Sequence, residues 1–288
     1  MDYYAMVQKS IDYIEDNLED RIYLEQVAEQ ACFSITHFYR IFQAMVGESV
    51  KEYIRKRRLS EAAHKLLATK SKVIDIAFDY HFESQEAFTR AFDRMYGITP
   101  GRYRKFRQEL LLFEKINVSE RKHQNLFGGL YMEPKIIMKN GFSVIGMECQ
   151  MSQEEKEAGF NPAVELWNKF NNRKGEIANA IPNVNIGLSP YETGYDAKHS
   201  YIAGVEVAKV DKVPDGMVVR TVPAAKFAVF MIKGKISEWG KQFDFIFGKW
   251  IPESKYEFDT VDSMEVYGEK AKDINSEEYE YELYLPIK

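Results

Sequence analysis

Features that would place the chain in a membrane or an oxidising compartment are missing from the sequence. No apolar run approaches the roughly 18 residues that a membrane-spanning helix needs. The start, MDYYAMVQKS, carries an acid and lacks the apolar core of a secretory signal. The two cysteines, Cys32 and Cys149, lie far apart, with neither metal nor redox spacing. These absences predict a cytoplasmic protein with no membrane partner.

Motifs for the common catalytic chemistries are also missing. The five histidines show no metal-ligand spacing, and the sequence contains neither a G-x-S-x-G nucleophile motif nor a phosphate-binding loop. Acid–base chemistry by a Glu and Tyr pair stays open. We therefore expect no enzyme activity, no cofactor and no metal. A small-molecule hydrolase or a sequestering protein is the alternative for the C-terminal half.

Charge is distributed unevenly along the chain. The 288 residues, enough for two domains, carry a net charge of −5. Residues 21–107 nevertheless hold 16 Lys and Arg against 10 Asp and Glu, with much of the excess in IRKRR (54–58) and GRYRKFR (101–107). A basic block in an acidic chain suggests an acidic partner for one domain. For IRKRR alone, a solvated helix face is the simpler explanation.

One pattern occurs twice in this block. AEQACFSITHFYRIF starts at Ala28, and AFDYHFESQEAFTRAF starts at Ala77. Ten positions match, with one extra residue in the second copy: Leu24 and Val73, Val27 and Ile76, Ala28 and Ala77, Phe33 and Phe82, Phe38 and Phe88, Arg40 and Arg90, Phe42 and Phe92, Met45 and Met95, Gly47 and Gly97, Tyr53 and Tyr103. Such repetition indicates one structural unit present twice.

Each copy has apolar residues at helical spacing on both sides of a short break. In the first copy Ser34 can cap the second helix, and Gly47 suits a left-handed residue at its end. Two helices joined by three or four residues form a helix-turn-helix, whose second helix can enter the major groove of DNA. A plain helical hairpin is the alternative for one copy, and two matched copies favour DNA binding.

The outward side chains of each second helix suit base recognition. They include Thr36, Tyr39 and Arg40 in the first copy and Gln85, Glu86 and Arg90 in the second. Arg can bind guanine or a phosphate, Gln can bind adenine, and Thr can touch a thymine methyl group. Residues 49–71 are expected to form one long helix that holds the two units, so that one monomer reaches successive major grooves about 34 Å apart.

Residues 7–107 resemble the DNA-binding domain of the AraC/XylS family of transcription regulators. FESQ, FTRAF and the ending GITPGRYR carry the resemblance most specifically. It implies promoter DNA and RNA polymerase as partners, activation of transcription, and base contacts through the six side chains above. Two turn positions depart from the family, which usually has Gly there because the backbone is left-handed. This chain has Cys32 and His81, at a cost of about 1 kcal/mol for a non-Gly residue.

The C-terminal half has a different pattern. Strands are expected in FSVIGMEC, YIAGVEVAKV, AKFAVFMI, DSMEVYGE and YELYLPI, and helices near Asn161 and Ile236. The order predicts a strand-helix-strand-strand unit over residues 135–210 and a second such unit over residues 218–287. The predicted fold is thus multi-domain. An all-α N-terminal domain with two helix-turn-helix units precedes an α+β domain, in which two helices cover one face of an antiparallel sheet.

Acids and aromatic residues alternate along these strands. The candidate ligand-binding residues are Glu265, Tyr267, Glu206, Tyr201, Trp167, Trp239 and Glu282. Alternation places Glu265 and Tyr267 on one strand face. Carboxylates among aromatic rings suggest a site for an apolar or cationic ligand, although each Glu could instead face solvent.

This half resembles the GyrI-like effector-binding domain through YIAGVEV, VPAAKFAVF, WIP, MEVYG and YELYLPI. The resemblance implies a small-molecule sensor whose central acid is Glu265. The predicted boundaries are 1–112 for the DNA-binding domain, 113–132 for a linker and 133–288 for the effector domain. We expect a sequence-specific transcription activator whose C-terminal domain binds a lipophilic or cationic effector.

Overall fold

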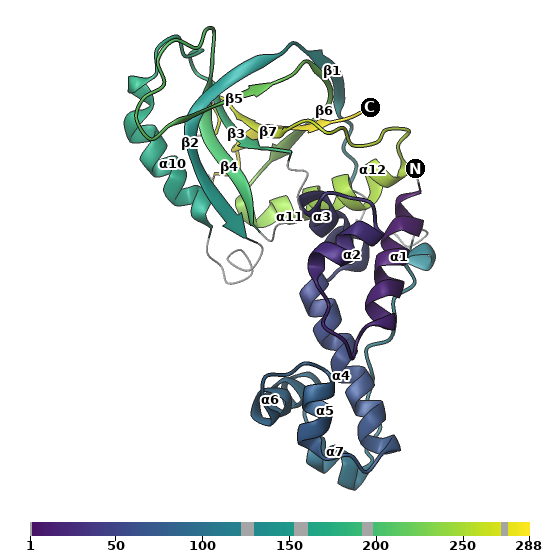
Figure 1. Cartoon of the computed structure of the whole chain (residues 1–288). Coiled ribbons are helices and arrows are strands. Elements are labelled where there is room, and N and C mark those ends of the chain that lie inside the picture. Colours follow the sequence, from purple (N-terminus) through teal and green to yellow (C-terminus); the bar gives the residue numbers. More distant parts are fainter. Residues whose placement is uncertain (1, 122–129, 153–160, 192–197, 272–275) are drawn as a thin grey trace. The chain divides into compact units, whose positions relative to one another are not determined.

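The computed structural model describes residues 2–121, 130–152, 161–191, 198–271 and 276–288, which form a helical unit and a sheet unit (Figure 1). Among the described residues, 2–33 and 37–121 belong to the helical unit and those from 130 onward to the sheet unit. The predicted two-part architecture, all-α and then α+β, is confirmed. No helix in these ranges is long and apolar enough to cross a membrane.

The helical unit contains both predicted helix-turn-helix units. Its helices are α1 (Tyr3–Asp16), α2 (Leu24–Gln30), α3 (Ile35–Val46), α4 (Val50–Ala68), α5 (Val73–Asp79), α6 (Gln85–Tyr96), α7 (Pro100–Phe106) and α8 (Val118–Arg121). The pairs α2–α3 and α5–α6 lie at opposite ends of the long helix α4 (Figure 1). The single helix predicted between the copies is therefore confirmed.

The two turns adopt the left-handed backbone that the family resemblance implied. Cys32 has a φ of 55° and His81 a φ of 59°, both left-handed. Each turn closes through the next residue, since Phe33 N–H donates to Ala28 O and Phe82 N–H donates to Ala77 O. The prediction of two left-handed non-glycine residues is confirmed, so both turns carry a local conformational cost.

Matched aromatic rings fill the two helix-turn-helix cores. Phe42 contacts Tyr53 with ring centroids 5.8 Å apart, and Phe92 contacts Tyr103 at 5.7 Å. All four rings are buried. Burying one such side chain contributes roughly 1.5–3 kcal/mol. The repeat therefore specifies two small cores with the same design.

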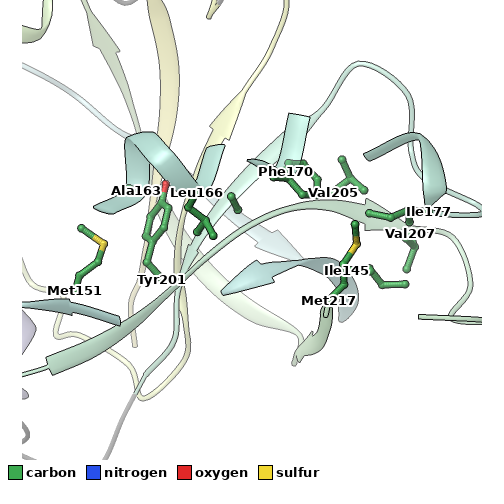
Figure 2. Packing of buried hydrophobic residues seen from close by; sticks show 11 residues of the cluster. Ile145, Met151, Ala163, Leu166, Phe170, Ile177, Tyr201, Val205, Val207 and Met217 are labelled. Atoms are coloured by element: carbon green, nitrogen blue, oxygen red, sulfur yellow. The ribbon is translucent and has the colours of Figure 1, made fainter. Parts of the chain in front are cut away.

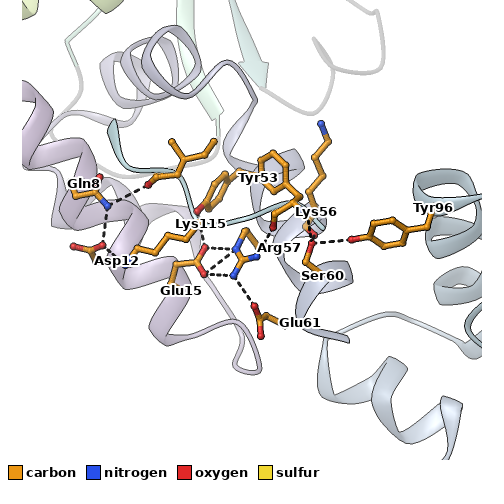
Figure 3. Close-up of polar contacts among 12 residues, drawn as sticks. Gln8, Asp12, Glu15, Tyr53, Lys56, Arg57, Ser60, Glu61, Tyr96 and Lys115 are labelled. Carbon is orange, nitrogen blue, oxygen red and sulfur yellow. Dashed lines mark hydrogen bonds and ion pairs between the residues drawn. The ribbon is translucent and has the colours of Figure 1, made fainter. Parts of the chain in front are cut away.

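A buried arginine joins α1, α4 and the segment after α7 (Figure 3). The Arg57 guanidinium donates to both carboxylate oxygens of Glu15, to Glu61 and to the carbonyl of Phe113. Glu15 also accepts a hydrogen bond from Tyr53 Oη at 2.7 Å. Hydrogen bonds from several partners satisfy this charge pair, as burial requires.

The other cations of IRKRR are also engaged within the helical unit. Arg55 and Lys56 pair with nearby glutamates, and Arg58 donates to backbone carbonyls of residues 17–20. The run is therefore neither a free basic surface nor simply a solvated helix face. Arg57 and Arg58 connect α4 to other parts of the helical unit, whereas Arg55 and Lys56 pair locally.

Part of the predicted linker, residues 113–132, packs on the helical unit. Phe113 N–H donates to Ser60 Oγ at 3.0 Å, and Val118 N–H donates to Gln8 Oε1 at 2.9 Å. Ile116 and Val118 are buried. Residues 122–129 lie outside the described part of the chain. The boundaries 1–112, 113–132 and 133–288 stay predictions.

The sheet unit is one antiparallel sheet of eight strands with the order β1-β6-β8-β7-β3-β4-β2-β5. Its elements are β1 (Lys135–Lys139), β2 (Phe142–Ser152), α10 (Pro162–Arg173), η1 (Lys174–Glu176), β3 (Asn185–Ser189), β4 (Lys198–Val207), β5 (Val218–Val222), β6 (Ala225–Lys233), α11 (Ile236–Phe245), η2 (Ile246–Trp250), α12 (Ile251–Glu253), β7 (Ser263–Tyr267) and β8 (Glu280–Pro286). The order is symmetric. If β1 is exchanged with β5, β2 with β6, β3 with β7 and β4 with β8, the list read backwards is unchanged. The predicted duplication is therefore confirmed, with an additional strand, β1 or β5, at the start of each repeat.

Each face of the sheet has its own core. On one face, Leu166 and Phe170 of α10 pack on Ile145, Tyr201 and Val205 (Figure 2). The other face buries a second cluster that includes Val144, Ile202 and Met264. Neighbouring residues of β4 therefore point into different cores, which determines the face on which each candidate acid can act.

Candidate DNA-binding surface and effector site

Helix α6 presents the second set of predicted base-contacting residues to solvent. Gln85, Glu86 and Arg90 are all exposed, whereas Phe88 is buried beneath them. Ser84 caps the helix by accepting a hydrogen bond from the Ala87 N–H. Hydrogen bonds from its own backbone amide and from Ser84 lower the pKa of Glu86, so α6 presents both charge signs. The face is suited to reading base edges, where an acid can accept from a cytosine amine.

Helix α3 presents its predicted residues differently. Tyr39 and Arg40 are half-buried, and each interacts with other residues of the chain. The Thr36 side chain lies outside the described residues. Gln43, which the prediction did not include among the base contacts, is exposed on this helix.

In the sheet unit, the structure brings the predicted central acid together with two predicted tyrosines. The hydroxyl of Tyr201 donates to Glu265 Oε2 at 3.0 Å, and that of Tyr267 donates to the same oxygen at 2.6 Å. Burial and the negative charge of Glu265 raise the pKa of both phenols well above the usual value. Both hydroxyls therefore stay protonated and act as hydrogen-bond donors to the carboxylate.

Aromatic rings form a continuous row beside this carboxylate. Trp167 of α10 contacts Tyr267 at 5.3 Å between centroids, Tyr267 contacts Tyr281 at 5.2 Å, and Tyr281 contacts Trp239 of α11 at 5.0 Å. Trp167 Nε1 also donates to Tyr201 Oη at 3.2 Å. The row extends from the helix of one repeat to the helix of the other, across the strands β7 and β8. It includes both predicted tryptophans and the buried Tyr281, which the sequence prediction missed.

A glycine provides the space for the Tyr201–Glu265 hydrogen bond. Gly187 lies on β3, directly opposite Glu265 on β7. A Cβ atom at position 187 would lie 2.1 Å from Tyr201 Oη and 3.0 Å from Glu265 Oε2. A side chain at this position is therefore incompatible with the observed arrangement. The strand pattern gave no signal for Gly187, because its role depends on pairing between distant strands.

Glu206 and Glu282 do not belong to this group. Strand register places both on the opposite face of the sheet from Glu265. There, Glu206 pairs with Lys139 at 3.0 Å, and Glu282 accepts a hydrogen bond from Tyr284 at 2.9 Å. The prediction that placed all three acids around one ligand is thus corrected, since odd and even strand positions point into different cores.

Two family models match the chain. The C-terminal match, "Integron-associated effector binding protein", covers residues 135–287, more than half of the chain. The N-terminal match, "Helix-turn-helix domain", covers residues 27–105. The chain therefore belongs to the integron-associated effector-binding family and joins that domain to an AraC-type helix-turn-helix domain, as the GyrI-like and AraC/XylS resemblances predicted.

Curated relatives support the N-terminal assignment. The HTH-type transcriptional activator AarP of Providencia stuartii is 39% identical over 100 residues, which cover 35% of this chain and 74% of AarP. The multiple antibiotic resistance protein MarA of Salmonella typhimurium is 38% identical over 98 residues, 34% of this chain and 77% of MarA. The chain thus belongs to the AraC-type family of transcription regulators.

A further relative is similar over a smaller share of its length. The HTH-type transcriptional regulator YbfP of Bacillus subtilis is 48% identical over 122 residues, 42% of this chain and 41% of YbfP. The chain therefore spans about two fifths of that relative.

Proposed function

We propose that this protein is a DNA-binding transcription activator controlled by a small lipophilic cation that binds beside Glu265. DNA binding is supported by the two helix-turn-helix units and by the exposed Gln85, Glu86 and Arg90 on α6. Activation is supported by the similarity to AarP, which is named as an activator. RNA polymerase is the partner that such an activator would contact.

One observation carries the proposal for the effector. The Glu265 carboxylate is balanced only by neutral donors, the hydroxyls of Tyr201 and Tyr267. Within the described part of the chain no cation pairs with it. A partly desolvated carboxylate without a counter-ion favours a bound cation, and the aromatic row supplies faces that attract cations and bury apolar groups.

The same geometry supports binding rather than turnover. Covalent catalysis by either tyrosine would need a readily ionised phenol. Burial and the Glu265 charge raise the phenol pKa values of both tyrosines, which disfavours the nucleophilic phenolate. We therefore assign Glu265 the role of charge partner for an intact ligand.

The test is transcription from a defined template. A duplex is first selected from a random-sequence library with the full chain and then placed upstream of a weak promoter. We expect RNA polymerase to make more transcript when this protein and tetraphenylphosphonium are both present than with either alone. Recovery of no specific duplex would refute DNA-binding regulation, and an unchanged transcript level with the cation would refute the proposed effector class.

A further inference from the structure

The loop between α1 and α2 touches the turn of the second helix-turn-helix unit. His81 donates its ring Nε2–H to the carbonyl of Glu19 at 2.9 Å, since a carbonyl can only accept. The hydroxyl of Tyr80 donates to the Glu19 carboxylate at 3.1 Å. Lys65 of α4 pairs with the same carboxylate at 2.9 Å. Glu19, in the α1–α2 loop, thus contacts both α4 and the second turn.

Helix α4 holds this loop in place from the other side. Arg58 donates to the carbonyl of Leu18 at 3.0 Å and to that of Asp20 at 2.8 Å. Three successive carbonyls of the loop, at residues 18, 19 and 20, are therefore bonded to side chains from α4 and from the second turn. Tyr80 is only 5% exposed, and the Lys65 ammonium lies 5.4 Å from the centroid of its ring.

The backbone conformation at His81 would suit glycine better than histidine. Its φ of 59° is the left-handed conformation, which glycine adopts without strain. The equivalent Cys32 has the same backbone, but its exposed side chain makes no hydrogen bond within the described part of the chain. Of these two turn residues, only His81 bonds to the α1–α2 loop, which leads into the first helix-turn-helix unit, within the described part of the chain.

We propose that Tyr80 and His81 are positioning residues for DNA recognition, which latch the second helix-turn-helix unit onto the α1–α2 loop and fix the rotation of α6 relative to α3. This inference rests on the proposed DNA-binding function. Without these contacts to the α1–α2 loop, the second helix-turn-helix unit would be freer to rotate about α4. B-DNA turns once per 10–10.5 base pairs, so one inserted base pair rotates one half of a two-part site by roughly 35° relative to the other. A protein in which α6 is fixed relative to α3 should bind the altered DNA much more weakly, whereas a protein in which α6 can rotate should lose less affinity.

The experiment compares three variants of the full chain. His81→Gly removes the latch and the strain together, and Tyr80→Phe removes one hydrogen bond while keeping the ring. Cys32→Gly is the matched control, because it makes the same change at the equivalent turn without touching the loop. The DNA probes are the duplex selected with the wild type and the same duplex with one base pair inserted between its two contacted halves.

We expect the insertion to weaken binding at least tenfold for the wild type and for Cys32→Gly. For His81→Gly the penalty should fall by threefold or more, with Tyr80→Phe in between. Amide hydrogen exchange of the DNA-free chain should quicken in residues 17–22 for His81→Gly and not for Cys32→Gly. A merely stabilising role would leave the insertion penalty unchanged.

Two results would overturn the latch: equal insertion penalties in wild type and His81→Gly, or unchanged exchange in residues 17–22. If the wild type selects no specific duplex, the proposed function fails, and the exchange measurement alone decides whether the latch exists.

Discussion

Gly187 and Glu265 face each other across strands β3 and β7, and they occupy equivalent positions in the two repeats of the sheet unit. Two carboxylates at these paired positions would repel each other, because directly opposite side chains are close neighbours. The duplicated domain therefore carries one acid at its centre and, opposite it, the space that Tyr201 uses to reach that acid.

Gly187→Ala tests this arrangement. The added Cβ would lie 2.1 Å from Tyr201 Oη, so the phenol must move and its hydrogen bond to Glu265 must break. We expect the free energy of unfolding to fall by about 1–3 kcal/mol, as for other overpacked sites. Tetraphenylphosphonium binding should also weaken. Urea titration and calorimetry measure the two effects. Gly175→Ala is the control, because a Cβ there meets no atom within 4 Å; equal behaviour of the two variants would contradict the packing argument.

Glu265→Gln tests the charge of the proposed effector. The substitution keeps the shape of the side chain and removes its charge. We expect tetraphenylphosphonium to bind about tenfold more weakly or worse, a loss of roughly 1.4 kcal/mol, whereas a neutral triaryl compound should lose little. Glu282→Gln is a matched control. That carboxylate also accepts a hydrogen bond from a tyrosine two residues away, but on the other face of the sheet. If only Glu282→Gln lost cation binding, the binding site would lie on that other face, and the assignment to Glu265 would be wrong.

Arg40→Ala and Arg90→Ala test the two recognition helices. Loss of a base-reading arginine should cost roughly 1–3 kcal/mol of binding free energy and relax specificity at one position. Loss of a phosphate-binding arginine should weaken binding to all sequences equally. Fluorescence anisotropy with the selected duplex and its single-base variants separates these cases. Arg173→Ala, in the sheet unit and paired with Glu176, is the control. Unchanged affinity in both helical variants would mean that α3 and α6 do not read this duplex.

The sequence predicted local features best. Helical spacing placed the helices of both helix-turn-helix units, and the resemblance to the AraC/XylS family implied the left-handed backbone at Cys32 and His81. Strand alternation placed Glu265 and Tyr267 on one face. Features that depend on distant pairing were missed. The strands β1, β3 and β5 were not predicted, and strand register alone separates Glu206 and Glu282 from Glu265.

The buried Arg57 gives a sharp test of the core polar network, because the same helix carries a more exposed counterpart. The Arg57 and Glu15 side chains are 6% and 11% exposed, whereas Arg55 and Glu52 are both 35% exposed. Arg57→Ala leaves Glu15 without its partner in the interior and should cost about 3–5 kcal/mol. Arg55→Ala should cost about 0–1 kcal/mol. Urea unfolding of the full chain, followed by circular dichroism at 222 nm, distinguishes them, and the buried network contributes little if both midpoints shift equally.

The boundary of the DNA-binding domain is open to a direct test with two fragments. A fragment of residues 1–112 ends at the predicted boundary, and one of residues 1–121 includes the segment that packs on α1. Ile116 is 7% exposed and Val118 is fully buried, so losing them exposes apolar surface worth roughly 1.5–3 kcal/mol for each side chain. The hydrogen bonds between Phe113 and Ser60, and between Val118 and Gln8, are lost as well. We therefore expect the longer fragment to melt at the higher temperature and to retain DNA binding more completely. Within it, Ile116→Ala should lower the melting temperature and Leu111→Ala should not, because Leu111 is 97% exposed. Identical melting of the two fragments would show that residues 113–121 belong to the linker in function as well as in sequence.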